Sequence, residues 1–263
     1  MLGLALMVGA IGCRKSGAPA PSANASATPP PSDELLVSSV VDAAGLHVQT
    51  GSFSRAASWG FTDIGLDASR TSLRIAPSKH GAPLGQLLPK NGLAVINGGY
   101  FEPDFRPSTW LVDESVELSP KTDTSKGGVL AVGPGGIFVG AFAGLSFQPA
   151  LAVQSFPLIV EAGGLSGIHR DDGRRAARTV ACLVGNGLHL IVIAAPRGDG
   201  PTLFESAALL RAAAPRGFGC SIALNLDGGP SSGVWFGPEI AARQRAPLAN
   251  VGYAIAIMPR AAH

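Results

Sequence analysis

Residues 179–194 read TVACLVGNGLHLIVIA, two apolar runs on either side of Asn186 and Gly187. An Asn-Gly pair between two apolar runs is the strongest short-range signal of a β-hairpin, because both residues tolerate the positive φ angles of a tight turn. We therefore predict strands at 179–184 and 188–194. The hairpin points to a fold built from short strands and tight turns.

Composition supports this interpretation over the whole chain. The 263 residues include 35 Gly and 21 Pro, which argues against a helical bundle or a coiled coil. Charged residues make up 14% and hydrophobic residues 46%, which excludes a disordered polyelectrolyte. The net charge is +2 with no dense Lys/Arg stripe, so no nucleic-acid partner is expected. Besides the hairpin, strands are predicted at 35–41, 46–50, 73–76, 93–96, 109–112, 129–132, 137–139, 151–154 and 158–160.

One helix is predicted just after Pro201. Thr202 and Glu205 have the spacing of a capping box, in which each side chain accepts a hydrogen bond from the other's backbone N–H. An apolar stripe runs from there to Ala214, and Pro215 follows. Residues 86–88 indicate a second, short helix. The predicted fold class is therefore α+β: a sheet-dominated single domain with many short strands and one or two packed helices.

The N-terminus has the features of an export signal. An apolar run of residues 2–12 ends at Cys13, and the preceding residues resemble a bacterial lipobox, although no Lys or Arg precedes the run. We interpret 1–13 as a lipoprotein-type signal with lipidation at Cys13; an ordinary cleaved signal is the alternative. Residues 14–34 form a Pro/Ala/Ser-rich tether, and 35–263 the domain. The expected location is the bacterial cell envelope, anchored to the membrane through Cys13.

Cysteine and histidine usage gives no metal signature. The five His show no zinc-binding spacing, while a cation held by oxygen atoms alone would leave no pattern, so the metal content stays open. Cys182 and Cys220 could form a disulfide in an oxidising compartment. Both lie in apolar, strand-like surroundings, which favour buried free thiols.

The stretch 222–232, IALNLDGGPSS, is the best candidate for chemistry. A predicted strand ends in Asn225 and Asp227, and two glycines with a proline then force a turn before Ser231. Glycines leave backbone amides uncovered, so this turn could hold an anion or a sugar hydroxyl beside a carboxylate. The alternative is a plain Asp-Gly turn in which Asp227 only binds its own backbone.

A second stretch, VINGGYF at 95–101, repeats the pattern of an apolar strand that ends in Asn-Gly-Gly. Tyr100 and Phe101 follow at once, and Phe105 and Trp110 lie nearby. Aromatic faces near a polar strand end suit the C–H face of a carbohydrate, and equally suit a core.

Two further positions precede or follow predicted strands. Arg178 leads into the strand that starts at Thr179, where a guanidinium could clamp a phosphate through two hydrogen bonds. Gln154 separates two apolar runs, either as a ligand-binding residue or as a satisfied buried amide.

Along the chain, the four motifs follow one another as Asn97–Phe101, Gln154–Leu158, Arg178-Thr179 and Asn225–Ser231, and in this order they resemble the phosphodiester glycosidase family over about residues 90–257. The insert at 102–119 resembles bacterial envelope members of that family. The resemblance implies a hydrolase that cleaves a sugar-1-phosphodiester at the anomeric carbon of an envelope glycan, with no cofactor. Departures exist: Pro230 stands where a third Gly is more usual, and Phe156 where Gly is usual. The rival reading is a non-catalytic glycan-binding envelope lipoprotein.

The expected catalytic residues are Asp227, as base or nucleophile, and Arg178, which would hold the phosphate. A second carboxylate is not identified, because Glu161, Glu102 and Asp104 are equal candidates. The expected substrate-binding residues are Asn97, Gly98, Gly99, Tyr100, Gln154, Thr179, Asn225, Gly228, Gly229 and Ser231.

Overall fold

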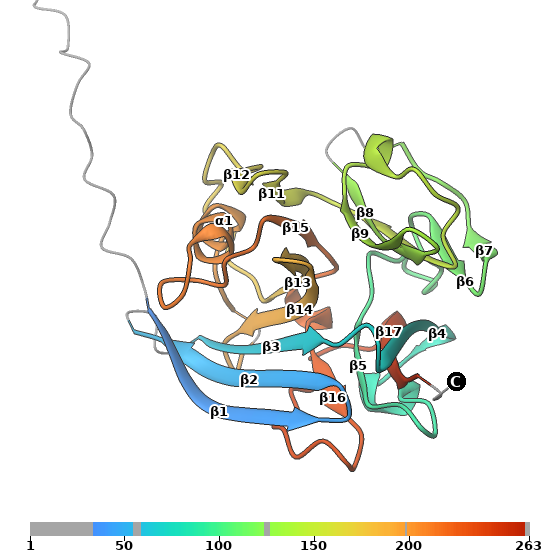
Figure 1. The fold of residues 1–263 in the computed structure, drawn as a ribbon, viewed down its shortest axis with the longest axis horizontal. Coiled ribbons are helices and arrows are strands. Elements are labelled where there is room, and N and C mark those ends of the chain that lie inside the picture. The colour runs from blue at the N-terminus through green and yellow to red at the C-terminus, as the bar shows by residue number, and fades with distance from the viewer. Residues whose placement is uncertain (1–33, 55–58, 124–126, 198, 261–263) are drawn as a thin grey trace, which may run out of the picture. The chain divides into compact units, whose positions relative to one another are not determined.

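The structure, a computed structural model, describes residues 34–54, 59–123, 127–197 and 199–260. The predicted signal segment, Cys13 and nearly all of the predicted tether lie outside the described residues. Within these ranges the strands form three antiparallel sheets (Figure 1). The largest sheet has the order β1 (Leu35–Ala43), β2 (Leu46–Phe53), β3 (Gly60–Leu66), β14 (Gly187–Ala194), β13 (Arg178–Val184), β15 (Ile222–Asn225), β11 (Leu158–Glu161), β12 (Leu165–Ser166).

The other two sheets are smaller. One has the order β7 (Val116–Ser119), β6 (Leu111–Asp113), β10 (Leu151–Ser155), β8 (Gly128–Gly133), β9 (Gly136–Gly140). The other has the order β16 (Val234–Phe236), β5 (Ala94–Asn97), β17 (Val251–Pro259), β4 (Thr71–Ala82). Short 3-10 turns lie at η1 (Leu84–Leu87), η2 (Phe142–Gly144) and η3 (Gly229–Ser231).

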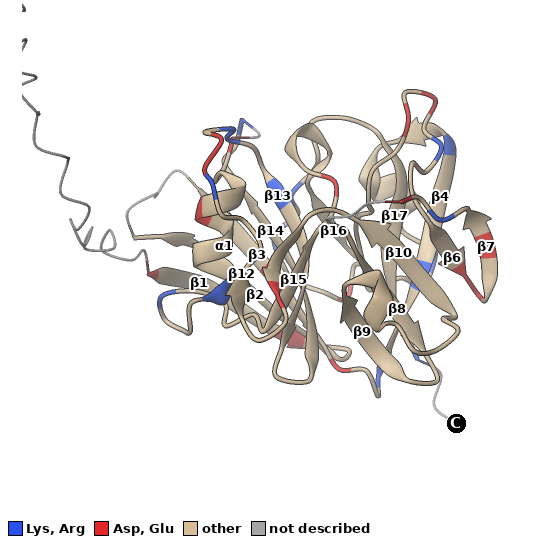
Figure 2. Ribbon diagram, turned by 90° about the horizontal axis from the view of Figure 1, so that it is seen from above, with Lys and Arg blue, Asp and Glu red and all other residues tan. Residues whose placement is uncertain are grey.

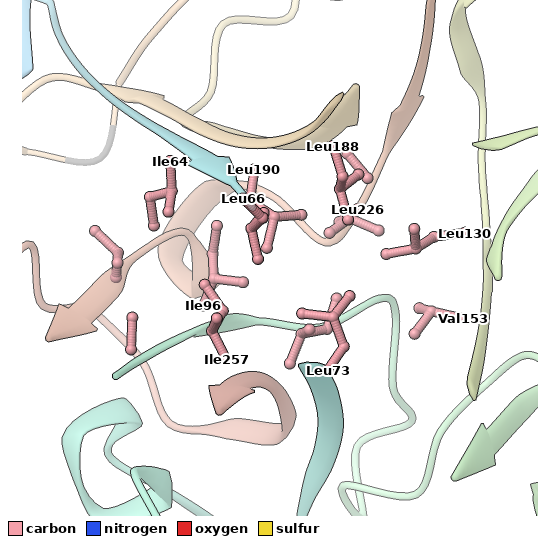
Figure 3. Close-up of a cluster of buried hydrophobic side chains, with 14 of the residues drawn as sticks. Ile64, Leu66, Leu73, Ile96, Leu130, Val153, Leu188, Leu190, Leu226 and Ile257 are labelled. Atoms are coloured by element: carbon pink, nitrogen blue, oxygen red, sulfur yellow. The ribbon is translucent and has the colours of Figure 1, made fainter. Parts of the chain in front are cut away.

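One hydrophobic cluster receives side chains from all three sheets (Figure 3). Leu190 comes from β14, Ile257 from β17 and Leu130 from β8, and none of them has measurable solvent exposure. Burial of apolar side chains is the main favourable contribution to folding. The three sheets therefore share one core. Charged residues lie mainly in the loops and near strand ends of the ribbon (Figure 2).

The predicted hairpin forms, with its turn one residue earlier than expected. Val184 pairs with Gly187, so Gly185 and Asn186 make the turn, and Gly185 takes the positive φ of +57°. This register pairs Leu183 with Leu188, whose side chain is fully buried in the shared core. A slip of one residue would turn Leu188 to the other face of the sheet, so core packing overrides the Asn-Gly preference.

The predicted helix is α1 (Leu203–Arg211), and the capping box at its start is confirmed. The backbone N of Glu205 donates to Thr202 Oγ1 at 3.1 Å, and the backbone N of Thr202 donates to Glu205 Oε2 at 2.8 Å. The helix packs on the largest sheet through a second hydrophobic cluster. It ends before Ala214, contrary to the predicted stripe, because the residue before a proline disfavours helical geometry.

The fold is mostly β. The sheet-dominated prediction is confirmed, whereas α+β describes it only loosely, since α1 is the one α-helix of the described residues. The predicted short helix at 86–88 overlaps the 3-10 turn η1. No helix in the described ranges has the length and apolar character needed to cross a membrane.

Cys182 and Cys220 form a disulfide, so the expectation of free thiols is wrong. Cys220 follows α1, and its backbone N donates to Leu210 O at 2.7 Å. This contact folds the segment after the helix back onto the sheet, where the two Cα atoms are 5.7 Å apart. Such a separation suits a disulfide, and spacing along the sequence could not reveal it.

Candidate active site

Asn97 links three elements near the start of β13 in the largest sheet. Its Oδ1 accepts hydrogen bonds from Thr179 Oγ1 at 2.7 Å and from the backbone N of Gly233 at 3.1 Å. Its Nδ2 donates to the backbone oxygen of Asp227 at 2.7 Å. The amide is buried and bonded at both ends, so it holds β5, β13 and the turn after β15 together. Three of the predicted motifs thus meet at this point.

Asp227 lies half-buried in the turn that follows β15. Its backbone N donates to Gly98 O at 3.1 Å, and its Oδ1 accepts from the backbone N of Gly228 at 2.8 Å. Burial raises the pKa of the Asp227 carboxyl, while hydrogen bonds from Ser231 and Gly228 lower it by less. No ion pair to Asp227 forms within the described part of the chain. A carboxylate with a raised pKa is a stronger base than an ordinary one.

Arg178 is a buried cation at the start of β13, only 9% exposed. Its Nε donates to Pro201 O at 3.1 Å and its Nη2 to Arg174 O at 2.8 Å. Among the described residues it forms no ion pair, and its Nη1 donates to none of them. Burial lowers the pKa of the guanidinium. A desolvated guanidinium with free N–H groups suits an anionic ligand such as phosphate.

Tyr100 lies close to both charges. Its hydroxyl donates to Phe156 O at 3.1 Å and accepts from Asn225 Nδ2 at 2.9 Å. Burial raises the pKa of Tyr100 to about 12, with a further increase from the charge of Asp227 and an opposing decrease from Arg178. The phenol therefore stays protonated at neutral pH. The backbone N of Leu226 donates to Thr179 O and that of Gly229 to Ala177 O, both at 2.8 Å, so the turn that carries Asp227 lies beside the start of β13, where Arg178 is.

Asn225 carries an unsatisfied buried acceptor. Its Nδ2 also donates to Phe156 O at 3.1 Å and Leu226 O at 2.7 Å, and since carbonyls only accept, these bonds fix the orientation of the amide. Its Oδ1 is sealed from solvent and accepts from no described residue. Such an atom typically costs about 1–3 kcal/mol, a strain that is found at functional sites.

The glycine amides are not free, contrary to the expectation of uncovered donors. Gly98 N donates to Tyr253 O at 3.1 Å, and Gly99 N donates to Tyr253 Oη at 2.9 Å. Gly229 N donates to Ala177 O at 2.8 Å, and Gly228 N binds Asp227 as described above. A Cβ at Gly98 would lie 2.2 Å from the Tyr253 ring, so glycine is needed there for close packing.

Gln154 is a buried amide whose hydrogen bonds are made within the protein, which is one of the two alternatives that the sequence left open for this residue. Its Oε1 accepts from the backbone N of Trp110 and of Thr122, both at 3.1 Å, and its Nε2 donates to Thr122 O. The side chain is 4% exposed. It holds the loop before β8 against β10, and contact with a ligand would require these bonds to break.

The four clustered aromatic residues separate in space. Trp110 is buried within the five-stranded sheet, and Phe101 stacks on Phe105 with ring centroids 5.6 Å apart. Only Tyr100 reaches the site, where it stacks on Phe156. Sequence reasoning assigned no role to Phe156, although its place directly after the strand that contains Gln154 is a signal of a strand-end position.

The candidate second carboxylates are exposed. Asp104 pairs with Arg106 at 2.6 Å. Glu161 lines a hollow of about 830 Å³ to which Pro157 also contributes. No group of three or more His, Cys, Asp or Glu in the described ranges is arranged to hold a metal ion. Asp227 is therefore the carboxylate that combines burial with the neighbouring Arg178 and Tyr100.

Comparisons with known proteins identify the family and the fold. The phosphodiester glycosidase family profile matches residues 90–258. The structure is similar to the catalytic domain of zebrafish N-acetylglucosamine-1-phosphodiester α-N-acetylglucosaminidase auto-inhibited by its pro-peptide, with a TM-score of 0.61 and 14% identity, over 87% of this chain and 83% of that one. No curated protein matches the sequence at a significant level.

Two bacterial structures share the fold. A hypothetical protein from Synechocystis has a TM-score of 0.55 and 15% identity over 87% of this chain; the chain spans 62% of that protein's length. A Burkholderia pseudomallei protein whose name assigns it to export has a TM-score of 0.54 and 13% identity, over 76% of this chain and 74% of that one. The chain belongs to the phosphodiester glycosidase family.

Proposed function

We propose that this protein hydrolyses a sugar-1-phosphodiester on a glycan or glycoconjugate of the bacterial cell envelope. One observation carries the proposal. Arg178, a buried cation without a carboxylate partner among the described residues, and Asp227, a half-buried carboxylate, both lie near the phenol of Tyr100. A phosphodiester presents an anion next to an anomeric carbon, which is the pattern that these two charges complement.

The reaction breaks the bond between the anomeric carbon and the phosphate oxygen. Water adds to the carbon, and a phosphomonoester leaves with the electron pair. Asp227 either removes a proton from the attacking water or attacks the carbon itself. Arg178 binds the phosphate and stabilises the charge of the leaving group. A phosphomonoester is a good leaving group, so the absence of an assigned second carboxylate does not prevent the chemistry.

The remaining predicted residues take positioning roles in this proposal. Asn97 and Thr179 fix the backbone of Asp227, and Ser231 donates to its carboxylate. Asn225 holds the hydroxyl of Tyr100, which donates hydrogen bonds at neutral pH. A sugar hydroxyl could satisfy the unpartnered Oδ1 of Asn225 only after a local rearrangement, because that atom is sealed from solvent.

The envelope location rests on Cys13 and on the name of the exported Burkholderia relative. We propose that Cys13 carries the lipid anchor, so Cys13→Ala should release the protein into the soluble envelope fraction. Unchanged partitioning into detergent would contradict the anchor.

The test of the activity is a matched pair of substrates. An anomeric phosphodiester of p-nitrophenol should be hydrolysed to free sugar and p-nitrophenyl phosphate, detected after phosphatase treatment. The corresponding p-nitrophenyl glycoside lacks the phosphate, and its rate should be at least about 100-fold lower, because Arg178 has no anion to bind. Equal rates, or no turnover across a panel of such diesters, would refute the activity; no turnover with retained sugar-phosphate binding would indicate a glycan-binding protein.

A further inference from the structure

Phe156 is an exposed aromatic side chain that the site holds in place. It is 38% exposed, and its ring stacks on Tyr100 with centroids 4.5 Å apart and planes at 26°. Its backbone oxygen accepts hydrogen bonds from Tyr100 Oη and Asn225 Nδ2, both at 3.1 Å. Exposing a large apolar ring forgoes the free energy of its burial. A single exposed ring is common on protein surfaces, and what distinguishes Phe156 is that its ring and its backbone oxygen are both held by residues of the site, Tyr100 and Asn225.

The hydroxyl of Tyr100 links this ring to the chemistry. Tyr100 Oη accepts a hydrogen bond from Asn225 Nδ2 at 2.9 Å, two residues before Asp227, so the stacked pair borders the place where the anomeric carbon would lie. Pro157 and Leu158, the next two residues along the chain, line a hollow of about 830 Å³ that leaves room for further parts of a glycan.

We propose that Phe156, supported by Tyr100, stacks against the C–H face of a pyranose ring and so selects a hexopyranose-1-phosphodiester. This inference rests on the proposed function and adds the residue that recognises the sugar. Aromatic faces attract the polarised C–H groups of one sugar face, and they bury that face from water. The same contact cannot form with the phosphate, which Arg178 binds.

The chain offers a matched control. Phe142, in the 3-10 turn η2, is 36% exposed, nearly the same as Phe156, and it packs edge-on against Trp110 with ring centroids 5.4 Å apart. Phe142→Ala removes the same number of atoms from a similar environment that has no contact with Tyr100.

The experiment measures affinities by calorimetry for glucose 1-phosphate, N-acetylglucosamine 1-phosphate and inorganic phosphate. Phe156→Ala should weaken binding of the better sugar phosphate about ten-fold and change that of inorganic phosphate less than two-fold, while Phe156→Trp retains both affinities. Phe142→Ala should match the wild type. Thermal melting of each variant shows whether it is folded.

The outcomes separate the two claims. Equal sugar-phosphate affinities in Phe156→Ala and Phe142→Ala, or no binding of either sugar phosphate to the wild type, would overturn the stacking role. Binding that depends on Phe156 without hydrolysis of any diester would leave the stacking role standing and refute the hydrolase.

Discussion

The hairpin of β13 and β14 has charged side chains at both of its ends. At one end they form an ion pair, and at the other, within the described ranges, they do not. Where β14 begins, Nδ1 of the half-buried His189 lies 2.9 Å from Oδ1 of the buried Asp63 on β3, so the two groups face each other. Burial lowers the pKa of His189, but the hydrogen bond and charge of Asp63 raise it by more. At the start of β13, Arg178 has no carboxylate partner among the described residues, and nor has Asp227 a cationic one.

The difference separates structure from function. A buried charge is costly unless a partner compensates it, so the paired end is arranged for a stable fold. Burial disfavours the charged form of each group: it raises the pKa of the Asp227 carboxyl and lowers that of the Arg178 guanidinium, which stays protonated at neutral pH. Such a cost is tolerated where a ligand supplies the missing partner. Substitutions at the two ends should therefore have opposite effects on activity and on stability.

The largest expected effect is that of Asp227→Asn. Turnover of a phosphodiester substrate should fall about 100-fold or more, because the amide can neither accept a proton nor attack the anomeric carbon. Stability should rise at pH 7 by a few degrees in melting temperature, since the ionised carboxylate is the form that burial disfavours.

The pH dependence of that gain has a definite sign. A raised pKa in the folded state means that Asp227 contributes stability while protonated, below its unfolded pKa, and loses it as pH rises through the folded pKa. The difference in melting temperature between variant and wild type should therefore shrink toward pH 3. Full turnover in Asp227→Asn would remove the residue from the mechanism, and a collapsed melting transition would assign it to the fold.

The next largest effect belongs to the paired end. Cys182 is the cross-strand neighbour of His189, and its disulfide to Cys220 closes a sequence separation of 38 residues. Replacing both cysteines by Ala should lower the free energy of unfolding by about 2–4 kcal/mol. Activity below the new melting temperature should stay within two-fold of the wild type. A large loss of activity in the folded double variant would mean that the two ends are coupled.

Much of the fold could be predicted because local patterns determined it. The hairpin of β13 and β14 and the capping box of α1 depend on neighbours in sequence. Strand β3 was missed because Asp63 and Gly65 interrupt its apolar pattern. The segment is recognisable as a strand only in the folded sheet, where it lies between β2 and β14. The disulfide was missed for a related reason, since it requires the chain after α1 to return to the sheet.

The sequence identified the motifs that form the site. It did not reveal which residue of each motif can contact a ligand. Asn97, Gln154 and the glycines stood out in the sequence, yet their hydrogen bonds are made within the protein. Conspicuous residue types near a turn do not reveal which of them remain free to meet a ligand. Phe156 drew no role because an apolar residue gives no chemical signal until its exposure and its contact with Tyr100 are known.

A smaller effect is expected from Arg178→Lys at the unpaired end. A lysine ammonium keeps the charge but lacks the planar fork that can bind two phosphate oxygens and still hold the carbonyl oxygens of Pro201 and Arg174. The KM for a phosphodiester should rise about ten-fold, with a smaller fall in kcat and melting within a few degrees of the wild type. An unchanged KM would show that phosphate binds elsewhere.

The smallest effect, and the sharpest test of the paired end, is that of Asp63→Asn. Because the pKa of His189 is raised in the folded state, its contribution to stability is present below its unfolded pKa of about 6.5 and is lost as pH rises through the folded value. The variant should be less stable by about 1 kcal/mol at pH 5.5, with a smaller deficit at pH 8.5 and normal turnover. Asp42→Asn is the control, since Asp42 pairs with His47 in the same way but both side chains are exposed, and it should change stability by less than about 0.5 kcal/mol. A deficit in Asp63→Asn that does not depend on pH would show that the hydrogen bond alone, and not the charge of His189, stabilises this end.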